Sequence, residues 1–289
     1  MISDNVTDSE YFMGKINIRP NIELFNAKLA LKVSGLLESG SQELDFLCPN
    51  AKSALLLILI KLQLKKDDLV SIITSSQGSY ISSCVTNTVE RICHWNREIC
   101  SDTKAVVVVN EFGFIADIEK INQEFSGPII EDNAYCFPAL LDSRRSKFKD
   151  FSIYSLPKFF GGEAGGLCIE DNLISQSQRL KLKTTFSKTV KSITNKRSEC
   201  HNKYRDICKR FRFDEFEFSL ENMCRSVFFL NLNSLPMEKI YALKEKVQNE
   251  GIECTIFYPL PLLILPCNST MGDNEISEIF FTIDRFLNS

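Results

Sequence analysis

The chain has 289 residues, 44% of them hydrophobic, and its 34 lysines and arginines against 37 aspartates and glutamates give a formal net charge of -3. This length suits one large and one smaller domain with a substantial core. The slightly acidic composition offers no general attraction to nucleic acid or to membrane surfaces, so we predict neither as a partner.

The N-terminus lacks the basic-then-apolar pattern of a signal peptide, and the longest apolar run, Ala54 to Ile60, is far too short to span a bilayer. We therefore expect a cytoplasmic protein in which this run forms a buried helix. The 11 cysteines are scattered without a C-x-x-C pair, and only two histidines could join them in a zinc site. We expect buried thiols and no metal site.

Apolar runs and helical periodicity predict alternating helices and strands in the first part of the chain. In order, we expect a helix from Ile22 to Leu37, a helix from Ala51 to about Leu64, a strand near Leu69 to Thr74, a helix running towards Arg91, a strand from Lys104 to Phe112, a helix from Ile115 to Phe125, and strands at Gly127–Asp132, Phe151–Ser155 and Gly166–Glu170. Asn50, after Pro49, is placed to cap the second helix. The strand that begins at Lys104 is apolar on both faces, so we predict an α/β sheet covered on both sides.

The composition changes after Asp171. Between Arg179 and Arg212 there are twelve basic residues and only two acidic ones. The usual interpretation of such a run is a solvated helical face. The functional alternative is attraction of the diphosphate of a nucleotide-linked sugar, or of an acidic surface on a partner subunit.

The C-terminal part predicts a βαβ-like unit followed by a last helix. Its elements are a strand at Ser226–Leu232, a helix at Pro236–Glu250 stopped by Gly251, a strand at Ile252–Pro259 and an amphipathic helix at Asp273–Leu287. We accordingly divide the chain into an N-terminal arm with a large α/β domain over residues 1–175 and a small α+β domain over residues 176–289.

The segment from Gly127 to Glu170 contains the residue types that pyridoxal phosphate needs. Asp132 ends one buried strand, and Lys158 lies just past another, before four closely spaced glycines. A carboxylate can keep the pyridine nitrogen protonated, and a buried lysine can form a Schiff base with the cofactor and then transfer protons. Taken alone, an acid at a strand end is more often a helix cap or a surface charge, and a lysine after a strand is usually solvated.

This segment resembles the DegT/DnrJ/StrS family of pyridoxal-phosphate-dependent sugar aminotransferases. In that family one strand ends in E-D-x-A, here Glu131–Ala134, and a later strand of F-S type leads to the lysine, here Ser152 to Lys158, then to a glycine-rich turn and a hydrophobic strand. The likeness continues more weakly from about Asn50 to the C-terminus. It implies an aspartate-aminotransferase-like fold of type I, with a mostly parallel sheet in the large domain, and a homodimer in which both subunits build each site.

The resemblance also implies roles for individual residues. Lys158 would bind the cofactor's aldehyde and move the proton between sugar and cofactor, and Asp132 would pair with the pyridine nitrogen. Tyr80 is the best match for the aromatic ring that covers the cofactor in this family; the alternative is a core tyrosine with a satisfied hydroxyl.

The phosphate is expected at a helix N-terminus, where unpaired amides favour an anion. The family has a Gly-Thr pair there, which Ala51 and Lys52 replace in this chain; the alternative is an ordinary capped helix. Ser155 is a second possible phosphate ligand. Tyr135 stands where the family has glutamine or histidine, and either its phenol bonds the cofactor's ring oxygen or the site has drifted.

The leading hypothesis is therefore a pyridoxal-phosphate aminotransferase that converts a nucleotide-linked keto-sugar to an amino-sugar, with glutamate as donor by family habit, for a surface polysaccharide such as lipopolysaccharide O-antigen or a glycosylated metabolite. The runner-up is a degenerate relative that binds a sugar nucleotide or a protein partner without transamination, because the family's G-x-N-x-R-like motif is absent and the chain is short. A third reading, sugar dehydration, is less favoured because such relatives change the lysine.

Overall fold

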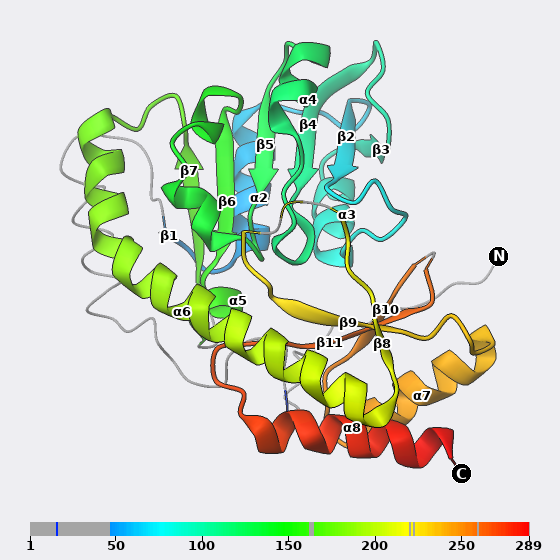
Figure 1. Cartoon of the computed structure of the whole chain (residues 1–289). Coiled ribbons are helices and arrows are strands. Elements are labelled where there is room, and N and C mark those ends of the chain that lie inside the picture. The colour runs from blue at the N-terminus through cyan, green and yellow to red at the C-terminus, as the bar shows by residue number, and fades with distance from the viewer. Residues whose placement is uncertain are drawn as a thin grey trace.

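The computed structural model describes residue 16 and residues 47–161, 165–219, 221, 223–258 and 260–288. The helix predicted from Ile22 to Leu37 lies outside these residues, as do Gly162 and Pro259. Two sheets lie one above the other, and the long helix α6 (Gln176–Phe211) runs past both of them (Figure 1).

The larger sheet has seven strands in the order β1-β7-β6-β5-β4-β2-β3. Their bounds are β1 Leu47–Cys48, β2 Leu69–Thr74, β3 His94–Asn96, β4 Thr103–Val109, β5 Ile129–Asp132, β6 Phe151–Ser155 and β7 Gly166–Glu170. Neighbouring strands from β3 through β2, β4 and β5 to β6 are parallel, whereas β7 is antiparallel to β6 and β1 is antiparallel to β7. The mostly parallel sheet predicted from the sequence is confirmed.

Helices cover both faces of this sheet, which explains the uninterrupted apolar run of β4. Val107 belongs to a core shared with α2 (Ala51–Lys61) and α3 (Ser83–Glu90), whereas its neighbour Val108 packs with α4 (Ile118–Glu124) on the other face. Because successive side chains of a strand point to opposite faces, a strand buried on both sides must be apolar at every position.

Helix α2 begins where the sequence predicts but is buried on one side only. The side chain of Asn50 accepts a hydrogen bond from the amide of Ser53 at 2.9 Å and so caps the helix. Leu55 is buried, whereas Leu57 and Ile60 are 52% and 54% exposed. The prediction of a buried helix over this apolar run is therefore wrong for its outer face, because the helical period turns these two residues towards solvent.

The smaller sheet has the order β10-β11-β9-β8, and each neighbouring pair is antiparallel. Its elements are β8 Asp214–Glu215, β9 Val227–Asn231, helix α7 Met237–Asn249, β10 Thr255–Phe257, β11 Leu262–Pro266 and helix α8 Asp273–Leu287. Helix α7 connects β9 to β10, which are parallel to each other but separated by β11, a strand that we did not predict. The predicted βαβ-like unit is thus split by an inserted strand, while the last helix is confirmed.

Helix α6 belongs to the cores of both sheets. Phe186, in its first half, packs in a cluster with residues of β6 and β7, and Tyr204, in its second half, packs with the small sheet, α7 and α8. The predicted division at residue 175, directly before this helix, stays a prediction. No helix among the described residues is long and apolar enough to cross a membrane.

Candidate active site

Asp132 and Lys158 lie at the same edge of the large sheet, where the parallel strands β5 and β6 end. Asp132 is the last residue of β5, and Lys158 lies in the short helix α5 (Leu156–Phe160) that directly follows the neighbouring parallel strand β6. Asp132 is 5% exposed, and its Oδ1 accepts a hydrogen bond from the amide of Ala134 at 2.8 Å. Burial raises the pKa of Asp132, and the positive charge of Lys158 partly opposes that rise. The two residues predicted to flank the cofactor therefore lie at the ends of adjacent parallel strands.

The packing around α5 directs the lysine side chain. Leu156, Phe159 and Phe160 are buried in the cluster that contains Phe186, whereas Lys158 is only half-buried. Helix α5 ends at Gly161, whose φ of 84° lies in the left-handed region that favours glycine. A short helix anchored by its apolar neighbours thus holds the amine at the sheet edge.

Tyr135 forms the surface against which the lysine rests. The Nζ atom of Lys158 lies 3.8 Å from the centroid of the Tyr135 ring, which is a close cation–π contact. The sequence reading considered the phenol oxygen of Tyr135 as the interacting group, whereas the contact in the structure is made by its ring. The proposed bond between that phenol and the cofactor stays a prediction.

Tyr80 belongs to an aromatic cluster next to this pair. Its ring centroid lies 5.5 Å from that of Phe112 and 5.6 Å from that of Phe257, and the Phe112 ring lies 5.0 Å from that of Tyr135. Burial raises the pKa of Tyr80, Tyr135 adds to the rise, and the charge of Lys158 opposes it. Tyr80 therefore lies near the lysine and in an apolar cluster at the same time. Because Phe257 belongs to β10, the small sheet borders the site here.

The turn before Tyr80 is held by a carboxylate that sequence reasoning missed. Glu111 is 4% exposed and accepts hydrogen bonds from the amide of Ser76 at 2.9 Å and from the hydroxyl of Ser75 at 3.4 Å. On the outside, Arg97 donates to the carbonyl of Gly78 at 3.0 Å. Burial raises the pKa of Glu111, and the serine hydrogen bonds oppose that rise. The signal that marked Asp132, an acid just past a buried strand, also fits Glu111.

Glu131, the neighbour of Asp132, is the centre of a buried network of hydrogen bonds and ion pairs. It is fully buried and accepts hydrogen bonds from Asn110 at 2.9 Å and from Arg145 Nε at 2.8 Å, and it forms an ion pair with Lys149. Burial acts to raise its pKa, but the charges of Lys149 and Arg145 outweigh burial and lower the pKa to about 2. This network fixes the end of β5 from the face opposite to Asp132.

The predicted phosphate residues are partly brought together. Ser155 pairs with Gly166 across β6 and β7, and a Cβ atom on Gly166 would lie 2.7 Å from the amide nitrogen of Ala51. The start of α2 therefore packs against the start of β7, whose first residue, Gly166, is the cross-strand partner of Ser155. The side chain of Lys52 is exposed. Phosphate binding by these residues stays a prediction.

The basic segment between Arg179 and Arg212 forms most of α6, and its members have different environments. Arg179 pairs with Asp171 at 2.9 Å and Arg205 with Glu215 at 2.6 Å. Arg179 and Arg205 are half-buried, and Arg197 is buried. The other basic residues of the helix are exposed. A solvated face, as the sequence suggests, accounts for most of this segment.

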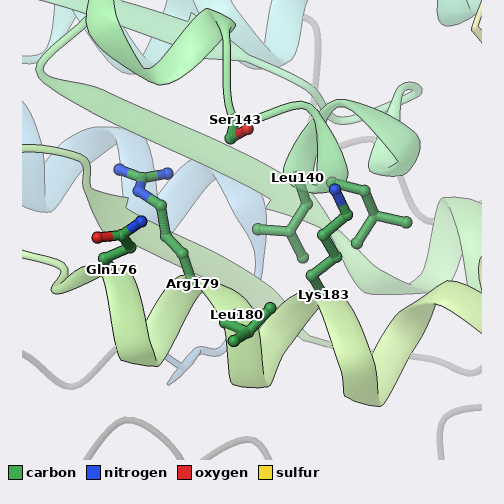
Figure 2. Close-up of a pocket in the computed structure, with 7 residues that line it drawn as sticks. Leu140, Ser143, Gln176, Arg179, Leu180 and Lys183 are labelled. Carbon is green, nitrogen blue, oxygen red and sulfur yellow. The ribbon is translucent and has the colours of Figure 1, made fainter.

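A cavity of about 200 Å³ lies apart from the lysine, at the start of α6 (Figure 2). Its lining residues are Leu140, Leu141, Ser143, Gln176, Arg179, Leu180 and Lys183. Arg179 and Lys183 both point from α6 to the side on which Ser143 lies (Figure 2). No predicted site residue lines this cavity. Among the described residues, no group of three or more histidines, cysteines and acids is arranged to hold a metal ion.

In this mostly parallel sheet one strand ends in an acid, Asp132, and a lysine, Lys158, follows the neighbouring strand. This arrangement is that of the type I pyridoxal-phosphate transferases. Solved structures with this fold cover nearly the whole chain. The aminotransferase TlmJ from Streptoalloteichus hindustanus is 14% identical, with a TM-score of 0.64 over 94% of this chain and 99% of that chain. A DegT DnrJ EryC1 StrS aminotransferase from Brucella abortus is 14% identical, with a TM-score of 0.61 over 92% of each chain.

A third similar structure contains the cofactor in question. The pyridoxal-phosphate form of the protein described as "Putative sugar aminotransferase Spr1654" from Streptococcus pneumoniae is 13% identical, with a TM-score of 0.64 over 93% of this chain and 97% of that chain. These structures confirm the predicted fold and the predicted resemblance to sugar aminotransferases. A comparison with curated proteins finds no match.

The family model described as "Putative PLP-dependent aminotransferase" matches residues 38–271, and the chain belongs to this family. The protein is thus an aminotransferase, and its cofactor is pyridoxal phosphate. The residues at the sheet edge fit that cofactor: an amine is presented on an aromatic ring, and a buried acid lies close enough for the two charges to interact.

Proposed function

We propose that this protein transfers an amino group from an amino acid, glutamate by family habit, to the ketone of a nucleotide-linked sugar. The observation that carries the proposal is that Asp132 ends β5 and Lys158 directly follows the neighbouring parallel strand β6, in a chain of the aminotransferase family. The sugar substrate is supported by similar structures, since Spr1654 is described as a sugar aminotransferase and DesI was solved with its TDP-sugar product.

When bound, pyridoxal phosphate supplies an electron sink for the carbon that gains or loses a proton. In this proposal Asp132 holds the proton on the ring nitrogen, and Lys158 binds the aldehyde and then carries the proton to or from the reacting carbon. Tyr80 covers the ring, and Tyr135 supports the amine. Ala51, Lys52 and Ser155 hold the phosphate, with the amides of the first turn of α2 as donors.

The proposal includes a homodimer in the cytoplasm, and use of the amino-sugar in a surface polysaccharide or a glycosylated metabolite. The dimer is checked by light scattering of the purified protein across a range of concentrations. A constant monomer mass would exclude a site shared between two copies.

Cofactor binding by Lys158 is tested by reconstitution. The protein should turn yellow with pyridoxal phosphate, and borohydride should remove the colour and leave the cofactor attached to the peptide that contains Lys158. Lys158→Ala should not be labelled. A wild-type protein that stays colourless with excess cofactor would favour the non-catalytic alternative, a relative that binds a sugar nucleotide or a protein partner.

Transamination is tested by a half-reaction. Glutamate should bleach the yellow form, and a nucleotide-linked keto-sugar should restore the colour while an amino-sugar accumulates. A panel of nucleotide sugars then identifies the acceptor. Restoration by free keto acids alone, with none of the sugars active, would reject the sugar substrate while keeping the aminotransferase.

A further inference from the structure

Arg197 is a buried cation beneath the site. It lies near the middle of α6 and is 1% exposed. One terminal nitrogen, Nη2, donates to the main-chain carbonyl of Lys158 at 2.6 Å. The other, Nη1, donates to the hydroxyl of Ser226 at 2.7 Å and to the sulfur of Cys224 at 3.2 Å. Its guanidinium carbon also lies 5.0 Å from the centroid of the Phe159 ring.

The Ser226 hydroxyl extends this contact to the second residue of the site. Its oxygen lies 3.0 Å from the carbonyl of Tyr135 and 3.2 Å from that of Cys224, so its single proton is shared between these two acceptors. One guanidinium is therefore bonded directly to the backbone of Lys158 and, through one hydroxyl, to the backbone of Tyr135. These are the two residues whose side chains lie 3.8 Å apart.

Packing alone does not account for an arginine at this position. Arg197 takes part in none of the ion pairs among the described residues, and its buried Nε has no hydrogen-bond partner there. Burying a cation without an acid is costly, and an apolar residue of similar volume would fill the same space at less cost. The planar fork of arginine, however, holds several acceptors in fixed directions, which lysine does not.

We propose that Arg197 is a positioning residue that fixes the backbones of Lys158 and Tyr135 relative to each other, so that the amine stays over the ring and close to Asp132. The inference rests on the proposed function, because it takes Lys158 as the residue that binds the cofactor. Its failure and the failure of that function give different results in the experiment below.

The experiment compares Arg197→Lys and Arg197→Met with the wild type and with a matched control, Lys196→Met, which changes an exposed neighbour on the same helix. Each protein is reconstituted with pyridoxal phosphate. Four properties are measured: the visible circular dichroism of the bound cofactor, the pH midpoint of its visible absorbance, the midpoint of thermal unfolding, and the affinity for the cofactor in an absorbance titration. The first two report the orientation and surroundings of the lysine–cofactor bond, which a merely structural residue would not change.

We expect both Arg197 variants to bind cofactor about tenfold to a hundredfold more weakly, with a smaller visible dichroism and a shifted pH midpoint, because small misplacements of reacting groups have effects of this size. Arg197→Lys should recover little of the affinity or dichroism, since lysine keeps the charge but lacks the planar guanidinium fork. The control should match the wild type. Variants that lower only the unfolding temperature would overturn the proposal.

Ser226→Ala provides a second test should the Arg197 variants not fold. It removes the link to Tyr135 and keeps the bond from Arg197 to Lys158, so we expect a smaller dichroism change in the same direction. Unchanged dichroism and pH midpoint in Ser226→Ala would overturn the proposal. A wild-type protein that takes up no cofactor would reject the proposed function, and this inference with it.

Discussion

The Nζ atom of Lys158 lies 3.8 Å from the centre of the Tyr135 ring. A ring face attracts a cation, whereas a glutamine or histidine at this place would offer a directed hydrogen bond. The substitution seen in the sequence therefore changes the kind of support that the amine receives, while the charge of the amine still opposes the rise in the pKa of Asp132.

Removing the ring of Tyr135 should weaken cofactor binding more than removing its hydroxyl. A cation–π contact of about 0.5–2 kcal/mol corresponds to a roughly 2- to 30-fold change in affinity. Tyr135→Ala should show a loss in this range in an absorbance titration with pyridoxal phosphate, and Tyr135→Phe should stay close to wild type. An equal loss in both variants would assign the effect to the phenol oxygen instead.

Asp132→Asn should lower amino transfer while it stabilises the cofactor-free protein near neutral pH. The folded protein raises the pKa of Asp132, so its stabilising contribution is present below the ordinary value of 3.8 and is lost as the pH rises through the raised value. Asparagine keeps the shape but cannot ionise. Single-turnover rates should fall by about a hundredfold or more, because asparagine has no carboxylate to keep the ring nitrogen protonated. The unfolding temperature without cofactor should rise; a fall would contradict the buried-charge argument.

Glu131→Gln should destabilise the fold strongly. Leaving Arg145 and Lys149 without their shared carboxylate should cost about 3–5 kcal/mol in the free energy of unfolding, measured with denaturant. Glu124→Gln is the matched control, since its pair with Lys120 is exposed and such pairs contribute about 1 kcal/mol or less.

The same carboxylate predicts a pH dependence. The pKa of Glu131 is lowered from 4.5 to about 2, so the stability that it contributes is fully present above 4.5 and is lost as the pH falls towards 2. The difference in stability between wild type and Glu131→Gln should therefore shrink over this window. A difference that stays constant would show that folding does not lower the pKa of Glu131.

Gly166→Ala should disturb the start of α2. The added Cβ would lie 2.4 Å from the carbonyl carbon of Asn50 and 2.7 Å from the Ala51 nitrogen, and because these are backbone atoms there is little room for adjustment. We expect a loss of about 1–3 kcal/mol in stability. The preference for pyridoxal phosphate over unphosphorylated pyridoxal should also fall, because the amides of this turn move. Gly272→Ala, whose Cβ would meet only the end of the Glu275 side chain, is the control.

The elements nearest the site could be predicted because their signals are local. The apolar strands β4, β5 and β6 and the residues Asp132 and Lys158 follow from runs of five to ten residues. Strand β11 was missed because prolines flank its apolar segment, and its pairing with β9 depends on distant residues. The place of Tyr80 in an aromatic cluster likewise depends on Phe257, more than a hundred residues away.

Arg197 was missed for a different reason. In a segment with twelve basic residues, from Arg179 to Arg212, the sequence pattern predicts that its charge is solvated like the others. Its spacing does hold information, since it lies four residues after Ile193 and three before Cys200, both of which are buried, and so falls on the apolar face of α6. The basic composition of the segment predicts an exposed Arg197, whereas the helical period correctly indicates a buried one.

Helix α6 has 36 residues without a break and reaches roughly 54 Å at the standard rise per residue. One end is locked into the core beneath the lysine, and the other into the core of the small sheet. A continuous helix that is packed into both cores disfavours rigid rotation of one half relative to the other. Entry and exit of the proposed sugar nucleotide should then depend on loops around the site, and engineering of turnover in this protein should start with those loops.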